Sequence, residues 1–137
     1  QGLPIAGTSA GAAVMSAVMI HAMPDKPALL SGNTPTIPGL GLAPGLIIDQ
    51  HFIVRRRMNR LLSAVIDHPD LLGVGIGEAT AIIVRGKRFT VMGENSVIVI
   101  DPRAAKLAKP KKGKLQSATR LRLLVLKAGQ DFLFGGK

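Results

Sequence analysis

The pentapeptide Gly7–Gly11 (GTSAG) is the segment whose residue types could perform covalent chemistry. Its G-x-S-x-G spacing is typical of a nucleophile elbow, a strained turn that exposes a serine hydroxyl between a strand and a helix. The apolar run Leu3–Ala6 predicts that strand, and Ala10–His21 predicts the helix. An activated Ser9 would attack a carbonyl carbon, while the N–H of Ala10 would donate to the oxyanion that forms. An ordinary turn of small residues remains the alternative.

A serine nucleophile needs a general base, and the sequence contains three histidines: His21, His51 and His68. His21 falls at the end of an apolar helix, and His68 lies in the predicted turn Asp-His-Pro-Asp. His51 instead follows the predicted strand Gly45–Ile48 and precedes the predicted helix Ile53–Ile66. Functional groups of open α/β sheets collect beyond the carboxyl ends of strands. The pattern therefore favours His51.

Glu78 is the carboxylate predicted to orient that imidazole. It follows the β-branched run Val74–Ile76, again at the end of a predicted strand. A carboxylate bonded to the imidazole fixes its tautomer and stabilises the imidazolium. On the sequence alone, a solvated turn acid is an equally good interpretation of Glu78. The chain order Ser9, His51, Glu78 differs from the serine, acid, histidine order of α/β-hydrolases, which disfavours a lipase or esterase.

These side chains must be positioned by helices alternating with short strands. After the proline-rich loop Pro24–Pro44, the patterns predict strands at Gly45–Ile48, Val74–Ile76, Ala81–Val84, Phe89–Met92, Val97–Ile100, Thr119–Leu126 and Asp131–Phe134. The early strands alternate with helices, which favours parallel pairing, whereas the later strands follow one another closely and favour hairpins. The expected fold class is α/β with an antiparallel β extension.

The composition limits the class of protein. A chain of 137 residues with 47% hydrophobic residues can form one domain with a core. The lack of cysteine excludes a disulfide scaffold, a cysteine nucleophile and a thiolate metal site. Neither a metal nor another cofactor is expected, since the three histidines are scattered. No apolar run is long enough for a membrane helix, and no targeting peptide is visible, so we expect a cytoplasmic protein.

The net charge of +10 is concentrated in two places. One is the cluster Arg55, Arg56, Arg57 and Arg60, and the other is the basic run from Arg103 to Lys127. Such an excess makes a nucleic-acid-binding module an alternative function. However, the chain has no Trp or Tyr for base stacking, and it contains no recognised nucleic-acid-binding motif. The basic run has no assigned role.

Taken together, these motifs resemble those of the cyanophycinase family of serine peptidases. The resemblance extends over nearly the whole chain and is carried by Gly7–Ala12 (GTSAGA), Asp49–Phe52 (DQHF), the spaced arginines Arg55, Arg57 and Arg60, and Gly75–Thr80 (GIGEAT). The DQHF block with its arginines is the specific part. The serine pentapeptide alone would also fit the related aspartyl dipeptidases.

The resemblance implies a flavodoxin-like three-layer sandwich related to class I glutamine amidotransferases. It also implies hydrolysis of cyanophycin, a polyaspartate with arginine on each β-carboxyl, to β-aspartyl-arginine dipeptides. Ser9 would be the nucleophile, His51 the general base and acid, and Glu78 its orienting carboxylate. The substrate pocket would be lined by Asp49, Gln50, Arg55, Arg57 and Arg60. The alternative within this fold is an α- or β-aspartyl dipeptidase, and a homodimer stays open.

Two departures from the family pattern lead to further expectations. Family members are considerably longer, so residues 1–137 are expected to be the C-terminal portion of a single α/β peptidase domain whose N-terminal portion is absent. The second oxyanion donor would belong to that portion, and the chain alone is therefore expected to be a catalytically idle fragment. In addition, Gly77 and Ala79 flank Glu78 where an acidic and a polar residue are expected.

Overall fold

The computed structural model describes residues 2–108 and 111–134. Its helices are α1 (Ala10–Ala13) and α2 (Met58–Asp67). Its strands are β1 (Val18–Ile20), β2 (Thr36–Pro38), β3 (Leu46–Asp49), β4 (Leu72–Ile76), β5 (Thr80–Arg85), β6 (Arg88–Gly93), β7 (Val97–Asp101), β8 (Lys106–Leu107), β9 (Ala118–Thr119), β10 (Arg122–Leu126) and β11 (Asp131–Leu133). The α/β class is confirmed.

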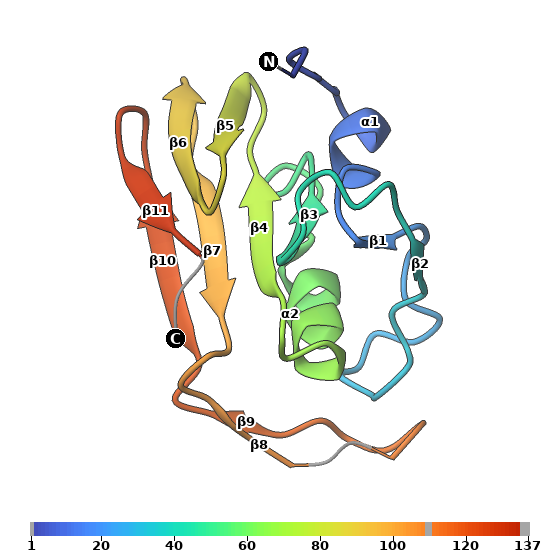
Figure 1. Ribbon diagram of the computed structural model, residues 1–137. Helices are drawn as coiled ribbons and strands as arrows, with labels where there is room; N and C mark the ends of the chain where they lie inside the picture. The colour runs from blue at the N-terminus through green and yellow to red at the C-terminus, as the bar shows by residue number, and fades with distance from the viewer. Residues whose placement is uncertain (1, 109–110, 135–137) are drawn as a thin grey trace.

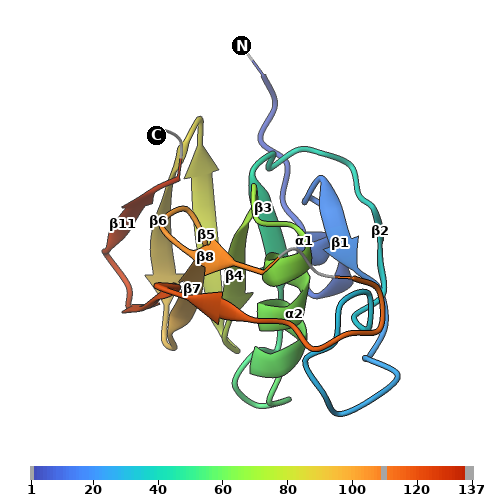
Figure 2. The ribbon, with the colours of Figure 1, turned by 90° about the horizontal axis from the view of Figure 1, so that it is seen from below.

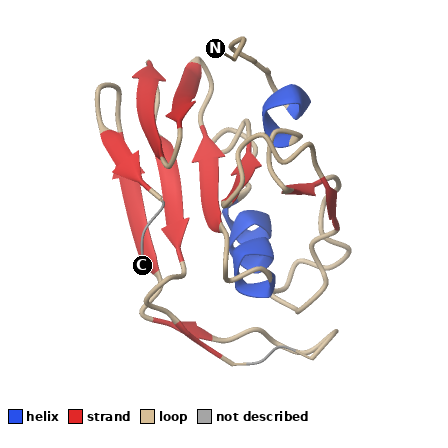
Figure 3. Ribbon diagram, viewed as in Figure 1, coloured by secondary structure: helices blue, strands red, loops and turns tan. Residues whose placement is uncertain are grey.

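A four-stranded sheet with the order β10-β7-β4-β3 forms the centre of the fold (Figures 1 and 3). β3 and β4 are parallel and are connected through α2, as parallel neighbours need a crossover. β7 is antiparallel to both β4 and β10. Within the central sheet, the prediction of early parallel pairing followed by antiparallel pairing is therefore confirmed, whereas the earlier pair β1 and β2 is antiparallel.

A three-stranded antiparallel sheet, in the order β11-β6-β5, forms the predicted antiparallel extension. Its inward side chains Phe89, Val91 and Phe132 share one core cluster with residues of β3, β4 and β7. The opposite face of the central sheet packs against α2 through a second cluster. In Figure 2, β4 lies between α2 and the small sheet. With both faces covered, β3, β4 and β7 are buried at every position.

Helix α2 is shorter than the helix predicted over Ile53–Ile66. It begins at Met58, because His51 and Arg56 both adopt a left-handed backbone with φ of 51°, which a right-handed helix cannot contain. Ile53 and Val54 consequently lie in an exposed turn. Leu61, Ala64 and Val65 face the sheet and are fully buried. The helix ends at Asp67, just before the His-Pro pair that disfavours its continuation.

Two predictions for the N-terminal region are wrong. Leu3–Ala6 forms no strand, because these exposed residues have no neighbouring strand in the part of the chain that is described. The helix predicted over Ala10–His21 ends at Ala13. Beyond it, β1 pairs with β2, a strand inside the predicted loop Pro24–Pro44. The tertiary environment thus overrides the helical preference of this small-residue segment.

Part of the basic run forms a hairpin, here termed the basic hairpin, and its last residues form β10 of the central sheet. β8 pairs with β9, and both lie below the rest of the molecule in Figure 1. Lys109 falls outside the described residues. The helices of the described ranges include none that is long and apolar enough to cross a membrane.

Candidate active site

Ser9, His51 and Glu78, which lie far apart in the sequence, form one hydrogen-bonded chain. Ser9 Oγ is 3.1 Å from His51 Nε2. The other ring nitrogen, His51 Nδ1, contacts Glu78 Oε1. Ser9 precedes α1, His51 follows β3, and Glu78 follows β4. The structure therefore brings together the nucleophile, base and acid expected from the sequence.

Ser9 lies in a strained backbone conformation at the start of α1, with φ 52° and ψ −119°. Few residues other than glycine adopt this region, and its strain is typical of functional sites. The turn is tight, because a Cβ on Gly7 would lie 2.3 Å from the carbonyl oxygen of Gly11. A Cβ on Gly11 would meet no atom within 4 Å. Close backbone approach thus explains Gly7 but not Gly11.

His51 is fixed through the residue that follows it. The Phe52 N–H donates to the carbonyl of Ile76 over 3.1 Å, which ties the turn to β4. The ring of Phe52 is buried against Gly75, where a Cβ would lie 2.4 Å from the ring atoms. The positioning roles of Phe52 and Gly75 were not predicted from the sequence. The available signal was a glycine inside a buried strand, which often marks a close approach.

Glu78 occupies the turn between β4 and β5. Its carbonyl oxygen accepts hydrogen bonds from Thr80 Oγ1 and Asn95 Nδ2, each over 2.9 Å. The neighbouring Gly77 has a steric reason, since a Cβ there would lie 2.9 Å from the carbonyl oxygen of Ser96. A side chain of the expected acidic type would not fit at this position unless the turn shifted.

Asp49, Arg57 and Arg60 form a buried cluster of charges next to His51. Asp49, which is 1% exposed, accepts hydrogen bonds from Nε and Nη2 of Arg60, the former over 2.7 Å. Arg57 Nη1 lies 3.5 Å from Asp49 Oδ1 and donates to the carbonyl of Gln50 over 2.7 Å. Burial lowers the pKa of Arg57, as does the charge of Arg60, whereas Asp49 raises it. The cluster thus connects the end of β3 to the start of α2.

The five predicted substrate-binding residues therefore differ in accessibility. Asp49, Arg57 and Arg60 are buried and bonded to one another. Arg55 is exposed, and Gln50 is half-buried, with a buried Oε1 atom that has no hydrogen-bond partner among the described residues. Contact of this set with a substrate stays a prediction, and Arg55 and Gln50 are its accessible members.

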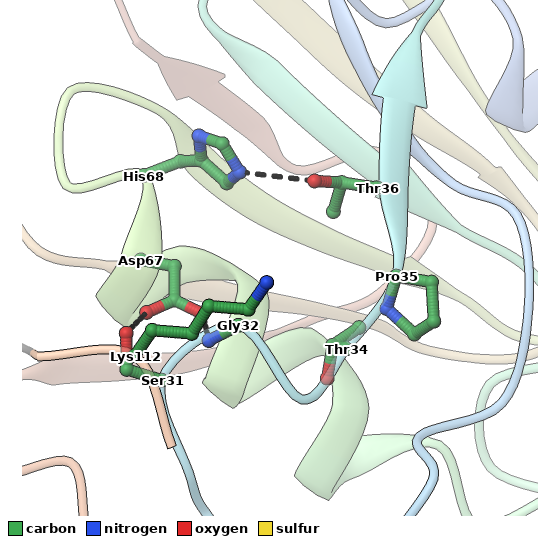
Figure 4. Close-up of a pocket in the computed structure, with 8 residues that line it drawn as sticks. All are labelled: Ser31, Gly32, Thr34, Pro35, Thr36, Asp67, His68 and Lys112. Atoms are coloured by element: carbon green, nitrogen blue, oxygen red, sulfur yellow. Dashed lines mark hydrogen bonds between the residues drawn. The ribbon is translucent and has the colours of Figure 1, made fainter. Parts of the chain in front are cut away.

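Two hollows in the described part of the molecule are lined by residues other than Ser9, His51 and Glu78. One, of about 310 Å³, lies between residues 23–28 and the first half of α2. The other, of about 550 Å³, lies at the end of α2 and is lined by Ser31, Gly32, Thr34, Pro35, Thr36, Asp67, His68 and Lys112 (Figure 4). In it, the Asp67 carboxylate accepts hydrogen bonds from the Ser31 hydroxyl and the Gly32 N–H. Its polar groups thus hold the loop against the helix.

Metal ligands do not gather in this structure. Within residues 2–108 and 111–134, no group of three or more His, Asp, Glu or Cys side chains could hold a metal ion.

Known proteins are similar to this chain well beyond the residues of the candidate site. The family model of Peptidase family S51 matches residues 1–92. The cyanophycinases of Trichormus variabilis and of a Nostoc species are each 44% identical over 140 residues, covering 95% of this chain and 45% of theirs. The cyanophycinase of Geminocystis herdmanii is 42% identical over 101 residues, covering 73% of this chain and 37% of its own. The chain thus spans about half the length of these curated relatives, or less.

A solved structure supports the fold. The crystal structure of a peptidase from an acI-B1 Actinobacterium superposes with a TM-score of 0.50 at 21% sequence identity. The superposition covers 92% of this chain and 43% of that one. At this identity the likeness concerns the arrangement of helices and strands alone.

Proposed function

The chain belongs to peptidase family S51, and from this premise we propose that the complete protein is a serine peptidase that hydrolyses cyanophycin to β-aspartyl-arginine. The hydrogen-bonded chain from Ser9 through His51 to Glu78 carries this proposal. The 44% identity to proteins named cyanophycinase supports the substrate. A flavodoxin-like architecture of the complete domain is part of the same proposal, supported by the parallel β3-α2-β4 unit.

In the proposed reaction, Ser9 Oγ attacks the carbonyl carbon of a backbone peptide bond while His51 Nε2 takes its proton. The Glu78 carboxylate accepts a hydrogen bond from the Nδ1–H of His51. The lone pair of the imidazole then lies on Nε2, facing Ser9. The C–N bond then breaks as His51 returns the proton to the leaving amine. Water, deprotonated by His51, hydrolyses the acyl ester and restores the Ser9 hydroxyl.

The oxyanion of the tetrahedral intermediate would be held in part by the Ala10 N–H. Among the described residues this N–H has no hydrogen-bond partner, whereas the next one, of Gly11, donates to Thr8. A free N–H directly after the nucleophile is the donor that a nucleophile elbow requires. A second donor would come from the upstream part of the complete protein.

The buried charge cluster and Arg55 would have different roles, the first in holding the turn that carries His51 and the second in binding substrate. The substrate is zwitterionic, and guanidinium groups bind carboxylates bidentately. Arg55 is exposed, and its N–H donates to the carbonyl of His51, so it lies next to the base. We therefore assign carboxylate binding to Arg55. Arg57 and Arg60 act through Asp49 and the Gln50 carbonyl to hold the turn that carries His51.

Labelling with a fluorophosphonate tests whether Ser9 is an activated nucleophile. Mass spectrometry should place the adduct on Ser9 in the wild-type chain, and Ser9→Ala and His51→Ala should abolish it. Ser117→Ala, which alters an exposed serine of the basic hairpin, should be labelled at the wild-type rate. Equal labelling of Ser9→Ala would overturn the assignment.

Incubation with cyanophycin tests the substrate. The complete protein should release β-aspartyl-arginine, detected by mass spectrometry, and Ser9→Ala should abolish this release. Release by the 137-residue chain that Ser9→Ala abolishes would refute the expectation that the chain alone is idle. Release that persists in Ser9→Ala would contradict the serine mechanism.

A further inference from the structure

We propose that Asn95 is a positioning residue that, with Thr80, holds Glu78 in contact with His51. This inference rests on the proposed function, in which Glu78 orients the imidazole of His51. Asn95 lies in the turn of residues 93–96, which connects β6 to β7 and is here termed the Asn95 turn. It is separated from Glu78 by 17 positions in the sequence.

Three hydrogen bonds connect Asn95, Thr80 and Glu78 in a closed ring. Asn95 Nδ2 donates to the Glu78 carbonyl over 2.9 Å, and Thr80 Oγ1 donates to the same oxygen over 2.9 Å. The Asn95 N–H in turn donates to Thr80 Oγ1 over 2.8 Å. The Glu78 carbonyl thus uses both of its lone pairs, and the Thr80 hydroxyl both donates and accepts.

The backbones of the two turns also lie close together. The Gly77 N–H donates to the carbonyl of Ser96 over 3.1 Å, and the Glu94 N–H donates to that of Ala79 over 3.0 Å. Gly93 has φ of 115°, and a Cβ there would lie 2.2 Å from the Ala79 carbonyl oxygen. The Asn95 turn is therefore fitted to the backbone on both sides of Glu78, and side chains at Gly77 or Gly93 would separate the two turns.

Glu78 needs such support because little else fixes it. Its side chain is 44% exposed, and the following residue, Ala79, has φ of 49°. The only side-chain contact described for its carboxylate is the one with His51. An orienting group must be held by its surroundings to fix the tautomer of its partner. Clamping the carbonyl of Glu78 supplies this constraint from the backbone.

The tautomer of His51 reports this positioning without requiring turnover. Long-range ¹H–¹⁵N spectra of the ¹⁵N-histidine-labelled chain, recorded where the imidazole is neutral, distinguish the Nδ1–H from the Nε2–H form. The Nδ1–H form should dominate at His51 in the wild type. Glu78→Gln and Asn95→Ala should both abolish that dominance. The signals that disappear in His51→Gln are those of His51. The remaining signals, from His21 and His68, are internal references in the same spectra.

Two further variants complete the test. Thr80→Val removes the hydroxyl from the hydrogen-bonded ring and should change the tautomer of His51 as Asn95→Ala does. Glu94→Gln is the control. It changes a neighbour in the same turn whose side chain makes no described hydrogen bond, and it should leave the tautomer of His51 unchanged. A wild-type tautomer in both Asn95→Ala and Thr80→Val, with a change in Glu78→Gln, would overturn the positioning role alone. A wild-type tautomer in Glu78→Gln would overturn the Glu78–His51 contact, and labelling of Ser9 tests the proposed function separately.

Discussion

Ser9 and His51 both have a positive φ, of 52° and 51°, which is uncommon for residues other than glycine. Such conformations cost about 1–3 kcal/mol each and persist only where surrounding contacts determine them. For Ser9, the tight turn at Gly7 supplies such a contact, and for His51 the burial of Phe52 does. The proposed nucleophile and the proposed base are thus held by different parts of the fold.

Glu78→Gln should lower kcat of the complete protein by about 10²–10⁴-fold, with a smaller effect on KM. An amide at this position neither stabilises the imidazolium nor selects one tautomer of His51. Steady-state kinetics of cyanophycin hydrolysis measure this. A wild-type kcat in the variant would show that Glu78 takes no part in the reaction.

Arg60→Ala should destabilise the fold by roughly 3–5 kcal/mol, because it leaves the Asp49 carboxylate buried without its main partner. Arg55→Ala is the matched control, since the side chain of Arg55 is exposed and its loss should change stability by only about 0.5 kcal/mol. Urea denaturation of both variants measures the free energy of unfolding and distinguishes a structural Arg60 from an exposed Arg55. Equal stabilities would contradict the assignment of Arg60 to the interior.

At the scale of elements, β4 supports the site through its glycines. Gly75→Ala should destabilise the chain by about 1–3 kcal/mol, as a methyl group would overlap the Phe52 ring and displace the turn that carries His51. Gly11→Ala is the control, because its Cβ would enter open space within α1. Thermal unfolding of the two variants tests the difference. A Gly75→Ala variant as stable as Gly11→Ala would show that the ring moves freely.

The strands of the central sheet could be predicted because their side chains decide their structure locally. Val97–Ile100 and Val74–Ile76 are short β-branched runs between turn residues, and both form strands. The N-terminal region could not be predicted this way. Val18–Ile20 continues an alanine-rich pattern, and its pairing with Thr36–Pro38 depends on a distant segment that local patterns do not reveal.

The candidate site was predictable to a similar degree. Ser9 lies in a G-x-S-x-G motif, and His51 and Glu78 each follow a predicted strand, so residue type and spacing are enough to select them as candidates. Asn95 carries no such signal, because an asparagine in a turn is ordinary and its role depends on the approach of two loops. The burial of Arg60 was also hidden, since arginine is normally exposed and only the pairing with Asp49 explains its position.

For the whole molecule, the excess of positive charge is partly neutralised at Asp101. This fully buried residue lies at the end of β7 and binds Arg103, with Arg122 3.4 Å away. The hydrogen bond from the Arg103 side chain lowers the pKa of Asp101, whereas burial raises it. The backbone N–H and the charge of Arg103 lower this pKa further. Two members of the basic run thus have a structural role.

Stability should therefore fall in acid. A carboxylate whose pKa is lower in the folded state contributes stability above its unfolded pKa, near 3.8, and loses it as the pH falls through the folded value. Asp101→Asn should be less stable than the wild type at neutral pH, and the difference should shrink below about pH 4. Urea denaturation at several pH values measures it. A difference that stays constant with pH would contradict the role of the ionised carboxylate.

The strand order β10-β7-β4-β3 also determines when the site can be completed during synthesis. β4 carries Glu78 at its end, but its neighbour on one side is β7, which the ribosome makes after the β5–β6 hairpin. Until Val97–Asp101 has emerged, β4 has an open edge, and the Asn95 turn has no fixed position. Ser9 and His51 therefore meet a Glu78 that is supported from both sides only after residues 97–101 have been synthesised.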